Sequence, residues 1–249
     1  LTVQQIMGEP LIVNKIARGR ELQDRVAALL ESVGLRPELM DRYPHAFSGG
    51  QRQRITVARA LLLDPKVIIA DEPVSMIDAS LRATVLKSLR QLRDEMGISI
   101  LYITHDLATA YHICDQIMVL YQGSVAEAGD VDVVIQAPKH PYTQLLVGSI
   151  PWPDPKRRWG QDTLLTQGDV FDVETKGCRF APRCAYAMDI CRQSPPPLFQ
   201  TEIDRAVTCF LYRDAPVLDR SEIDKVLGQN GRVAAEPQKE GAVPKAGAL

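Results

Sequence analysis

Between residues 48 and 106, helical and extended sequence patterns alternate, and this alternation limits the fold more than any other feature. A helical pattern ends at Asp64 and Pro65, and the apolar run "KVIIAD" follows at residues 66–71. The run is too short for a good helix and is typical of a buried parallel strand. A helical pattern at residues 79–96 and the apolar run "ISILYIT" at residues 98–104 repeat the order. Strands that alternate with helices predict an α/β fold with a parallel sheet.

Sequence patterns also predict helices and a strand on both sides of this segment. Residues 20–34 carry apolar side chains at helical spacing and end at Gly34, a residue typical of helix C-termini. Ser48 is the expected N-cap of the next helix. The run "DQIMVLYQ" at residues 115–122 turns at Gly123 and is expected to be a further strand of the alternation.

Composition narrows the class of protein. The 249 residues suffice for one large domain or two smaller ones. With 29 Lys plus Arg against 31 Asp plus Glu, the formal net charge is −2, so no basic excess points to nucleic acid as a partner. The apolar runs are far shorter than the roughly 20 residues that cross a bilayer, and the first residues show no signal-peptide pattern. We therefore expect a cytosolic chain that does not itself span a membrane.

Polar residues with useful chemistry follow the two central strands. Asp71 and Glu72 come at the C-terminal end of the first strand, where open parallel sheets bind ligands. An aspartate there can hold Mg²⁺ that bridges nucleotide phosphates, and the next carboxylate can deprotonate an attacking water. His105 directly follows the second strand and can hydrogen-bond a terminal phosphate. "SGGQ" at residues 48–51 opens a helix whose N–H groups favour an anion. Each feature alone is commonplace, but their order within one α/β unit indicates a nucleotide site.

Four ordered motifs in this region resemble those of the ATP-binding subunits of ABC transporters. The resemblance implies an α/β fold, a partial P-loop NTPase of the ABC type, whose parallel sheet is joined to a remnant of the helical subdomain and a small Cys-rich C-terminal extension. It covers roughly residues 1–212. The motifs are "SGGQRQR" at 48–54, similar to the signature motif; "VIIADE" at 67–72, similar to Walker B; "SMIDAS" at 75–80, similar to the D-loop; and "ITHD" at 103–106, similar to the switch-histidine motif.

In this family two subunits sandwich ATP, and the signature motif of one faces the γ-phosphate held by the other. The D-loop here has Met76 where the family usually has alanine, so we expect modest repacking. The residues implied by the resemblance are Ser48, Gly49, Gly50 and Gln51 for the partner's nucleotide, Asp71 for Mg²⁺, Glu72 as general base, His105 for the γ-phosphate, and Asp78 for the dimer interface.

One family motif is not found. No G-x-x-x-x-G-K-[ST] sequence, the Walker A loop that cradles phosphates, occurs in the 249 residues, and the glutamine loop is missing too. Leu1 rather than Met stands first, and the helix-like "LTVQQIMGEPLIV" begins at once with no preceding cap. We expect that an upstream portion is missing and that the chain alone binds ATP poorly and is inactive as an ATPase. The alternative to a truncated ATPase subunit is a non-catalytic or degenerate subunit that donates "SGGQ" to an intact partner.

A later segment narrows the resemblance to one branch. "APKHPYTQLL" at residues 137–146 is similar to the His-Pro-Tyr segment of oligopeptide, dipeptide and nickel importers, although Pro141 also fits an ordinary helix start. The branch implies peptide import at the cytoplasmic face of the cell membrane, as a peripheral subunit. The implied partners are a second ABC ATPase subunit, identical or different, transmembrane permease subunits and, indirectly, a substrate-binding protein. Chromosome-maintenance ATPases share two of the motifs, but the coiled-coil arms that they need are not visible.

Four cysteines crowd together late in the chain. In a reducing compartment a disulfide framework is not expected, so a metal or cluster is the better interpretation. The gaps of five and six residues between the first three are wider than those of ordinary zinc sites, whereas thiolates at irregular spacing can hold an iron–sulfur cluster. Some relatives carry a 4Fe–4S cluster in this extension. We expect such a cluster, with zinc or free cysteines as alternatives, at Cys178, Cys184, Cys191 and Cys209.

These patterns divide the chain into four parts. Residues 1–45 are expected to be the remnant of the helical subdomain, and residues 46–130 the second half of the nucleotide-binding core. Proline-rich stretches begin beyond about residue 130, so residues 131–212 are expected to form the peptide-importer C-terminal domain. Residues 213–249 end without apolar periodicity and are expected to be a disordered tail.

Overall fold

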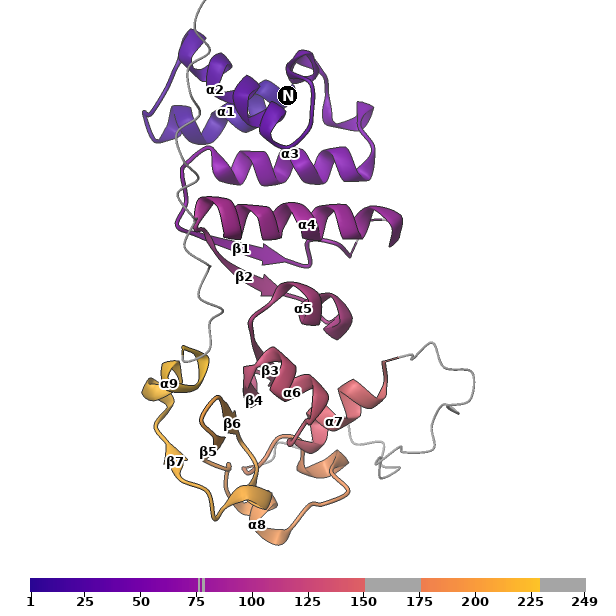
Figure 1. Ribbon diagram of the computed structural model, residues 1–249, viewed down its shortest axis with the longest axis vertical. Coiled ribbons are helices and arrows are strands. Elements are labelled where there is room, and N and C mark those ends of the chain that lie inside the picture. Colours follow the sequence, from indigo (N-terminus) through magenta and orange to yellow (C-terminus); the bar gives the residue numbers. More distant parts are fainter. Residues whose placement is uncertain (76, 78, 151–175, 229–249) are drawn as a thin grey trace, which may run out of the picture. The chain divides into compact units, whose positions relative to one another are not determined.

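The computed structural model describes residues 1–75, 77, 79–150 and 176–228, without the side chains of 79–81. The chain divides into two compact units, residues 1–113 and 114–249 (Figure 1). The boundary lies before the one expected near residue 130, because the strands on either side of Gly123 belong to the sheet of the second unit.

The first unit begins with helices that share one apolar core. These are α1 (Val3–Val13), α2 (Gly19–Ser32) and α3 (Gly49–Leu61), with two 3-10 turns between α2 and α3, η1 (Pro37–Asp41) and η2 (Pro44–Ala46). Their core therefore extends past residue 45 into α3. The buried side chains in it include Val3, Met7, Leu11, Leu22, Val26, Leu30, Phe47, Ile55 and Ala58.

The start of α1 corrects one expectation. Thr2 has the extended backbone of an N-cap, and its hydroxyl accepts a hydrogen bond from the backbone N–H of Gln5. The Gln5 side chain accepts one from the Thr2 N–H in return. The helix is therefore capped by a capping box, and the expectation that it begins without a cap is wrong.

The α/β part of the unit has the predicted parallel strands. β1 (Val67–Asp71) and β2 (Ser99–Ile103) are parallel neighbours joined through α4 (Ala79–Met96), and α5 (Leu107–Ile113) follows β2. Figure 1 shows α4 lying along the two strands. The parallel register pairs Asp71 with Ile103, so the two strands end at the same edge.

The two strands are not buried on both faces, which differs from the prediction. Ala70 is buried, but Val67, Ile69, Leu101 and Ile103 are 45–67% exposed. Successive side chains of a strand point to opposite faces, so these four positions share one face of the described sheet. In the described residues, one face of the strand pair is therefore open.

The second unit contains an antiparallel sheet of five strands in the order β3-β4-β6-β5-β7. The run at residues 115–122 does form a strand, but it pairs with the next segment instead of extending a parallel sheet. The reason is the turn at Gln122 and Gly123, whose φ angles of +45° and +73° give a tight hairpin. The strands are β3 (Gln116–Tyr121), β4 (Ser124–Asp130), β5 (Leu198–Glu202), β6 (Arg205–Val207) and β7 (Val217–Leu218).

Short helices surround this sheet, and the expected tail is ordered in its first part. Leu218 of β7 and Val226 of α9 are buried against β5 and β6 residues, so residues 213–228 are not a disordered tail. The remaining residues of that segment, 229–249, lie outside the described part of the chain.

The helices of the second unit are α6 (Val131–Gln136), α7 (Pro141–Gly148), α8 (Asp189–Gln193) and α9 (Asp224–Leu227), with 3-10 turns η3 (Ala181–Arg183), η4 (Phe210–Tyr212) and η5 (Arg220–Glu222). None of the described helices is long and apolar enough to cross a membrane.

Candidate functional site

The predicted anion-binding turn is the first turn of α3. Ser48 is its N-cap, as predicted: the hydroxyl accepts a hydrogen bond from the Gln51 backbone N–H at 3.3 Å, and the Gln51 side chain accepts one from the Ser48 N–H at 3.0 Å. The N–H of Arg52 donates to the Ser48 carbonyl. The backbone N–H groups of Gly49 and Gly50 come earlier in the chain than the N–H of Arg52. N–H groups in this first turn of a helix can bind an anion.

The predicted base and switch histidine meet at the ends of β1 and β2. His105 Nδ1 lies 2.6 Å from Glu72 Oε1. Glu72 has a left-handed backbone, with φ +46°, and its N–H donates to the Ile103 carbonyl at 2.9 Å. A left-handed glutamate is uncommon, and such residues cluster at active sites. The fold therefore holds the Glu72 carboxylate beside the imidazole.

This contact influences the charge of His105. The hydrogen bond that the Glu72 carboxylate accepts from the ring, reinforced by the carboxylate's negative charge, raises the pKa of the imidazole above its ordinary value. The side chains of His105 and Glu72 are 81% and 37% exposed, so water screens the interaction. An imidazole and a carboxylate at this distance can pass a proton between them, because proton transfer requires hydrogen-bond reach.

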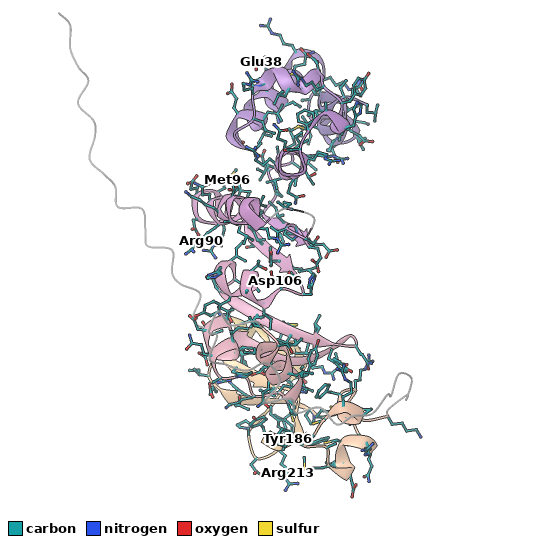
Figure 2. All side chains as sticks on the ribbon, turned by 90° about the vertical axis from the view of Figure 1, so that its right-hand side faces the viewer. Glu38, Arg90, Met96, Asp106, Tyr186 and Arg213 are labelled. Atoms are coloured by element: carbon teal, nitrogen blue, oxygen red, sulfur yellow. The ribbon has the colours of Figure 1, made fainter. Side chains whose placement is uncertain are left out.

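Asp106, the last residue of the predicted "ITHD" motif, has a structural role. Its Oδ1 accepts hydrogen bonds from the N–H groups of Ala108 at 2.9 Å and Thr109 at 3.3 Å, and thereby caps α5 (Figure 2). The cap follows His105 directly. It therefore fixes the turn that carries the imidazole.

The remaining predicted residues are placed as follows. Asp71 is exposed at the end of β1, next to Glu72, and Asp78 lies outside the described residues. Among the described side chains, the hydrogen bonds link Glu72 with His105 but do not link either to the turn at residues 48–51. The structure thus brings two of the predicted groups into contact and leaves the helix start separate.

The four predicted thiols line one cavity in the second unit. The cavity encloses about 10 Å³, room for about one water molecule. Burial raises the pKa values of the Cys178 and Cys184 thiols, and raises the pKa of Cys209 to about 12. Within the described part of the chain, no group of three or more Cys, His, Asp or Glu side chains is placed to hold a metal ion. As they stand, the thiols share one space without building the predicted cluster site or its zinc alternative.

The His-Pro-Tyr segment borders the same cavity. His140 is the N-cap of α7: its Nδ1 accepts a hydrogen bond from the Tyr142 N–H at 3.0 Å, and Pro141 takes the first helical position as predicted. His140 is 3% exposed, and burial lowers its pKa to about 4, so the imidazole is neutral at pH 7. Both His140 and Pro141 line the cavity with the thiols.

A buried ion pair supports that segment and was missed by sequence reasoning. Glu127 of β4 is fully buried, and its carboxylate accepts hydrogen bonds from the N–H groups of Lys139, at 3.1 Å to each oxygen, and His140, at 2.9 Å. Arg205, 3% exposed, lies 3.5 Å from the carboxylate. Desolvation raises the pKa of Glu127, whereas the N–H donors and Arg205 lower it. The sequence signal for this ion pair was one charged residue, Glu127, among the small and apolar residues of "SVAEAG" at 124–129.

Comparison with known proteins finds two matching family models and several similar proteins. The family model "ABC transporter" matches residues 2–75, and the model "Oligopeptide/dipeptide transporter, C-terminal region" matches residues 126–191. The dipeptide transport ATP-binding protein DppF of Haemophilus influenzae is 43% identical, over 84% of this chain and 64% of its own. The putative oligopeptide transport ATP-binding protein YkfD of Bacillus subtilis is 41% identical, over 88% of this chain and 68% of its own. In a solved structure of MJ1267 in its ADP conformation, an ATP-binding cassette of an ABC transporter, 62% of that chain matches 57% of this one at 26% identity and a TM-score of 0.49.

The two family models and the similarity to DppF and YkfD define the class as the ATP-binding proteins of ABC transporters. Within that class, the chain belongs to the family of oligopeptide and dipeptide transport ATP-binding proteins. The predicted family and branch are thus confirmed. The chain spans less than two thirds of the length of DppF, at 64%.

Proposed function

We propose that this chain supplies part of the ATP-binding and ATP-hydrolysing machinery of a peptide importer. The observation that carries the proposal is the contact of 2.6 Å between Glu72 and His105 at neighbouring strand ends. The transported class follows from the relatives, whose names specify dipeptide and oligopeptide transport. The partners are a second ABC ATPase subunit, permease subunits and, through them, a substrate-binding protein, at the cytoplasmic face of the membrane.

Each strand-end residue has a role in this proposal. Asp71, exposed at the end of β1, would hold Mg²⁺, which neutralises phosphate charge when bound. Glu72 accepts the proton of the attacking water, and its left-handed backbone and the 2.9 Å bond to β2 fix where that carboxylate lies. His105 orients Glu72 and can reach a terminal phosphate. Asp78 would serve the dimer interface.

The start of α3 serves a different nucleotide, one that the partner subunit holds. Ser48 to Gln51 are bonded among themselves and not to the strand-end groups, which supports a role in trans. Their N–H groups and hydroxyl would face the partner's γ-phosphate.

A second candidate function is favoured by the sequence. The 249 residues contain no phosphate-cradling loop, so a subunit made of these residues would donate Ser48 to Gln51 without hydrolysing ATP at its own carboxylates. The two candidates share the role of α3 and differ in the role of Glu72.

ATP hydrolysis by a mixed dimer tests both candidates. The full chain is combined with a dipeptide-type ATPase relative that has an intact phosphate loop, and Ser48→Ala is compared with Glu72→Gln. Each change should slow hydrolysis about 100-fold at the site that uses the residue. Thr2→Ala, which removes a similar capping box from α1, is the matched control and should have no effect. If only Ser48→Ala slows hydrolysis, the chain has the donor role. If Ser48→Ala and Glu72→Gln each slow it, the chain is an ATPase subunit. Unchanged hydrolysis with Ser48→Ala would overturn the proposal.

For the cysteines, we propose that they are the ligands of a 4Fe–4S cluster, with zinc as the alternative. Support comes from four thiols that line one cavity, because a 4Fe–4S cluster takes four thiolate ligands. Since the cavity encloses only about 10 Å³, the thiols have to move apart to admit it. A bound cluster would link the segment at residues 178–191 to Cys209 and so stabilise that part of the second unit.

Anaerobic purification tests the cluster directly. We expect a brown protein with about four iron atoms per chain and broad absorbance that bleaches on reduction. Cys209→Ser should remove most of the iron, whereas Cys114→Ser, outside the four, should retain it. Stoichiometric zinc without iron would refute the cluster.

A further inference from the structure

The last residue of the "SGGQRQR" segment has no part in the nucleotide roles proposed above, yet its side chain holds α3 against another helix. We propose that Arg54 is a positioning residue of the turn at Ser48 to Gln51. Its guanidinium fixes the start of α3 on the end of α2, so that the turn faces the nucleotide of the partner subunit. This role of Arg54 rests on the proposed role of that turn in trans.

Arg54 lies in the second turn of α3 and bonds to the end of α2. Its Nη1 donates to the carbonyl of Gly34 at 3.1 Å and to that of Val33 at 3.3 Å. Arg54 is half-buried. Hydrogen bonds from a charged donor are stronger than those between neutral groups, and a guanidinium keeps its charge throughout the physiological pH range. The two bonds therefore form a charge-assisted link between the helices.

The end of α2 is shaped to present these two carbonyl groups. Gly34 has a left-handed backbone, with φ +70°, which glycine adopts without a steric penalty. Its N–H donates to the Glu31 carbonyl at 2.9 Å. The N–H of Leu35 donates to the Leu30 carbonyl at 2.8 Å. This pair of bonds is the Schellman motif, and the negative end of the helix dipole favours a cation there. The Arg54 guanidinium is such a cation.

The turn at Ser48 to Gln51 is held from both sides. Phe47, immediately before it, is 6% exposed and belongs to the apolar core of the helices. Arg54 anchors α3 six residues after Ser48, which is about 9 Å along the helix axis. Ser48 and Gly49 lie exposed between these two anchors. The N–H groups that would face the partner's phosphate therefore keep one direction relative to the core, and loss of the Arg54 link would release one side of the turn.

A second arginine of α3 makes a different kind of contact. Arg59 pairs with Glu9 of α1 at 3.0 Å, and the two side chains are 42% and 61% exposed. Exposed pairs of this kind contribute little to stability because water screens them. Arg59→Met is therefore the matched control for Arg54→Met, since it removes a guanidinium from the same helix.

Three substitutions separate the charge, the bonds and the helix end. Arg54→Met keeps an apolar stem and removes the charge and both bonds. Arg54→Lys keeps the charge and can donate to one carbonyl group. Gly34→Ala leaves Arg54 in place but adds a Cβ atom 3.3 Å from its Nη1, in a backbone conformation that alanine rarely adopts. It should therefore disturb the same link from the α2 side.

The first measurement is ATP hydrolysis by the mixed dimer of the full chain with a dipeptide-type relative. The relative has an intact phosphate loop and alanine in place of its own signature serine, so that turnover requires the turn of this chain. At a saturating concentration of this chain, Arg54→Met should lower the maximal rate about 10-fold, as expected for loss of a hydrogen bond to a charged group. Arg54→Lys should lower it about 3-fold, and Arg59→Met should change it less than about 2-fold. The ATP concentration that gives half the maximal rate should stay unchanged, because the relative's own loop holds that nucleotide.

The result with Arg54→Met decides between positioning and a general defect. A rate that returns to that of the natural chain when more of the Arg54→Met chain is added would overturn the proposal, since a folding or assembly defect would then explain the loss. Equal rates with Arg54→Met and Arg59→Met would overturn it too. If the natural chain does not stimulate the relative, the role of the turn in trans fails and the role of Arg54 fails with it. If Ser48→Ala slows the reaction and Arg54→Met does not, only the role of Arg54 fails.

The coupling between Gly34 and Arg54 provides a second test. Gly34→Ala should lower the maximal rate about 3-fold in the natural background and no further in the Arg54→Met background, because the link is already lost there. Independent effects that multiply would show that the end of α2 does not act through Arg54.

Hydrogen exchange followed by NMR in the chain alone locates the change. With Arg54→Met, the Gln51 and Arg52 amides should exchange about 10-fold faster, whereas the amides of α1 should keep their rates. Faster exchange throughout α1 and α2 would contradict a role that is local to the turn.

Discussion

The two candidate sites of this protein are built in opposite ways. In the first unit, the functional groups stand at exposed ends of elements: Ser48 at the start of α3, and Glu72 and His105 at the ends of parallel strands. In the second unit, thiols from separate segments, two of them buried and two half-buried, line one cavity, and the buried pair Glu127–Arg205 holds the His-Pro-Tyr segment that borders it. An exposed site at element ends is ready for a ligand from another subunit. A buried site of this kind depends on long-range packing for its shape.

The largest effect should come from breaking the support of the buried site. Arg205→Ala leaves the Glu127 carboxylate buried without its cation, which should destabilise the second unit by about 3–5 kcal/mol. Hydrogen exchange by mass spectrometry should show loss of protection in β4, β6 and α7. The amides of α1 to α3 should keep theirs.

Arg213→Ala is the matched control for this change, because Arg213 is exposed in the same unit (Figure 2). It should change stability by less than about 0.5 kcal/mol. Equal effects of the two substitutions would show that the buried pair does not hold the site.

A smaller effect is expected at the exposed site. Ser48→Ala removes the side-chain cap of α3 and should destabilise the start of that helix by about 1 kcal/mol. Faster hydrogen exchange of the Gln51 amide would report it. Because Thr2 caps α1 in the same way, Thr2→Ala should cost a similar amount at α1. Loss of protection throughout the first unit with Ser48→Ala would contradict this local picture.

The smallest effect is a change in proton affinity. Glu72→Gln removes the hydrogen-bonding negative charge, so the raised pKa of His105 should fall towards the ordinary histidine value. The attraction between the two groups is complete below the unfolded pKa and is lost as the pH rises through the raised folded pKa. An NMR titration of the His105 ring in both chains measures the difference. Identical midpoints would show that the contact at 2.6 Å does not persist in solution.

The exposed site could be read from the sequence because local rules govern it. The cap at Ser48 and the end of β1 at Asp71 depend on a few neighbouring residues, and helical spacing alone gave α4 at residues 79–96. The placement of Glu72 and His105 after two strands was also predicted, but their contact at 2.6 Å was not.

The buried site could be read only in part. The four cysteines were recognisable as a set, but the place of His140 in the cavity lining depends on Glu127 of β4, and Cys209 follows β6, which pairs with β4 from far along the chain. A glutamate in a strand, such as Glu127, looks the same in sequence whether it faces solvent or a buried arginine. The membership of residues 115–122 in an antiparallel sheet was missed for a similar reason, because the turn at Gln122 and Gly123 decided it.

The central claim, that Ser48 faces a nucleotide held by a partner subunit, can be tested by vanadate photocleavage. In the mixed dimer with Mg²⁺, ATP and vanadate, the trapped vanadate takes the place of the γ-phosphate, and ultraviolet light cleaves the polypeptide that touches it. We predict cleavage of this chain at Ser48, which requires the partner and is lost with Ser48→Ala. Cleavage confined to the partner, with this chain intact, would contradict the claim.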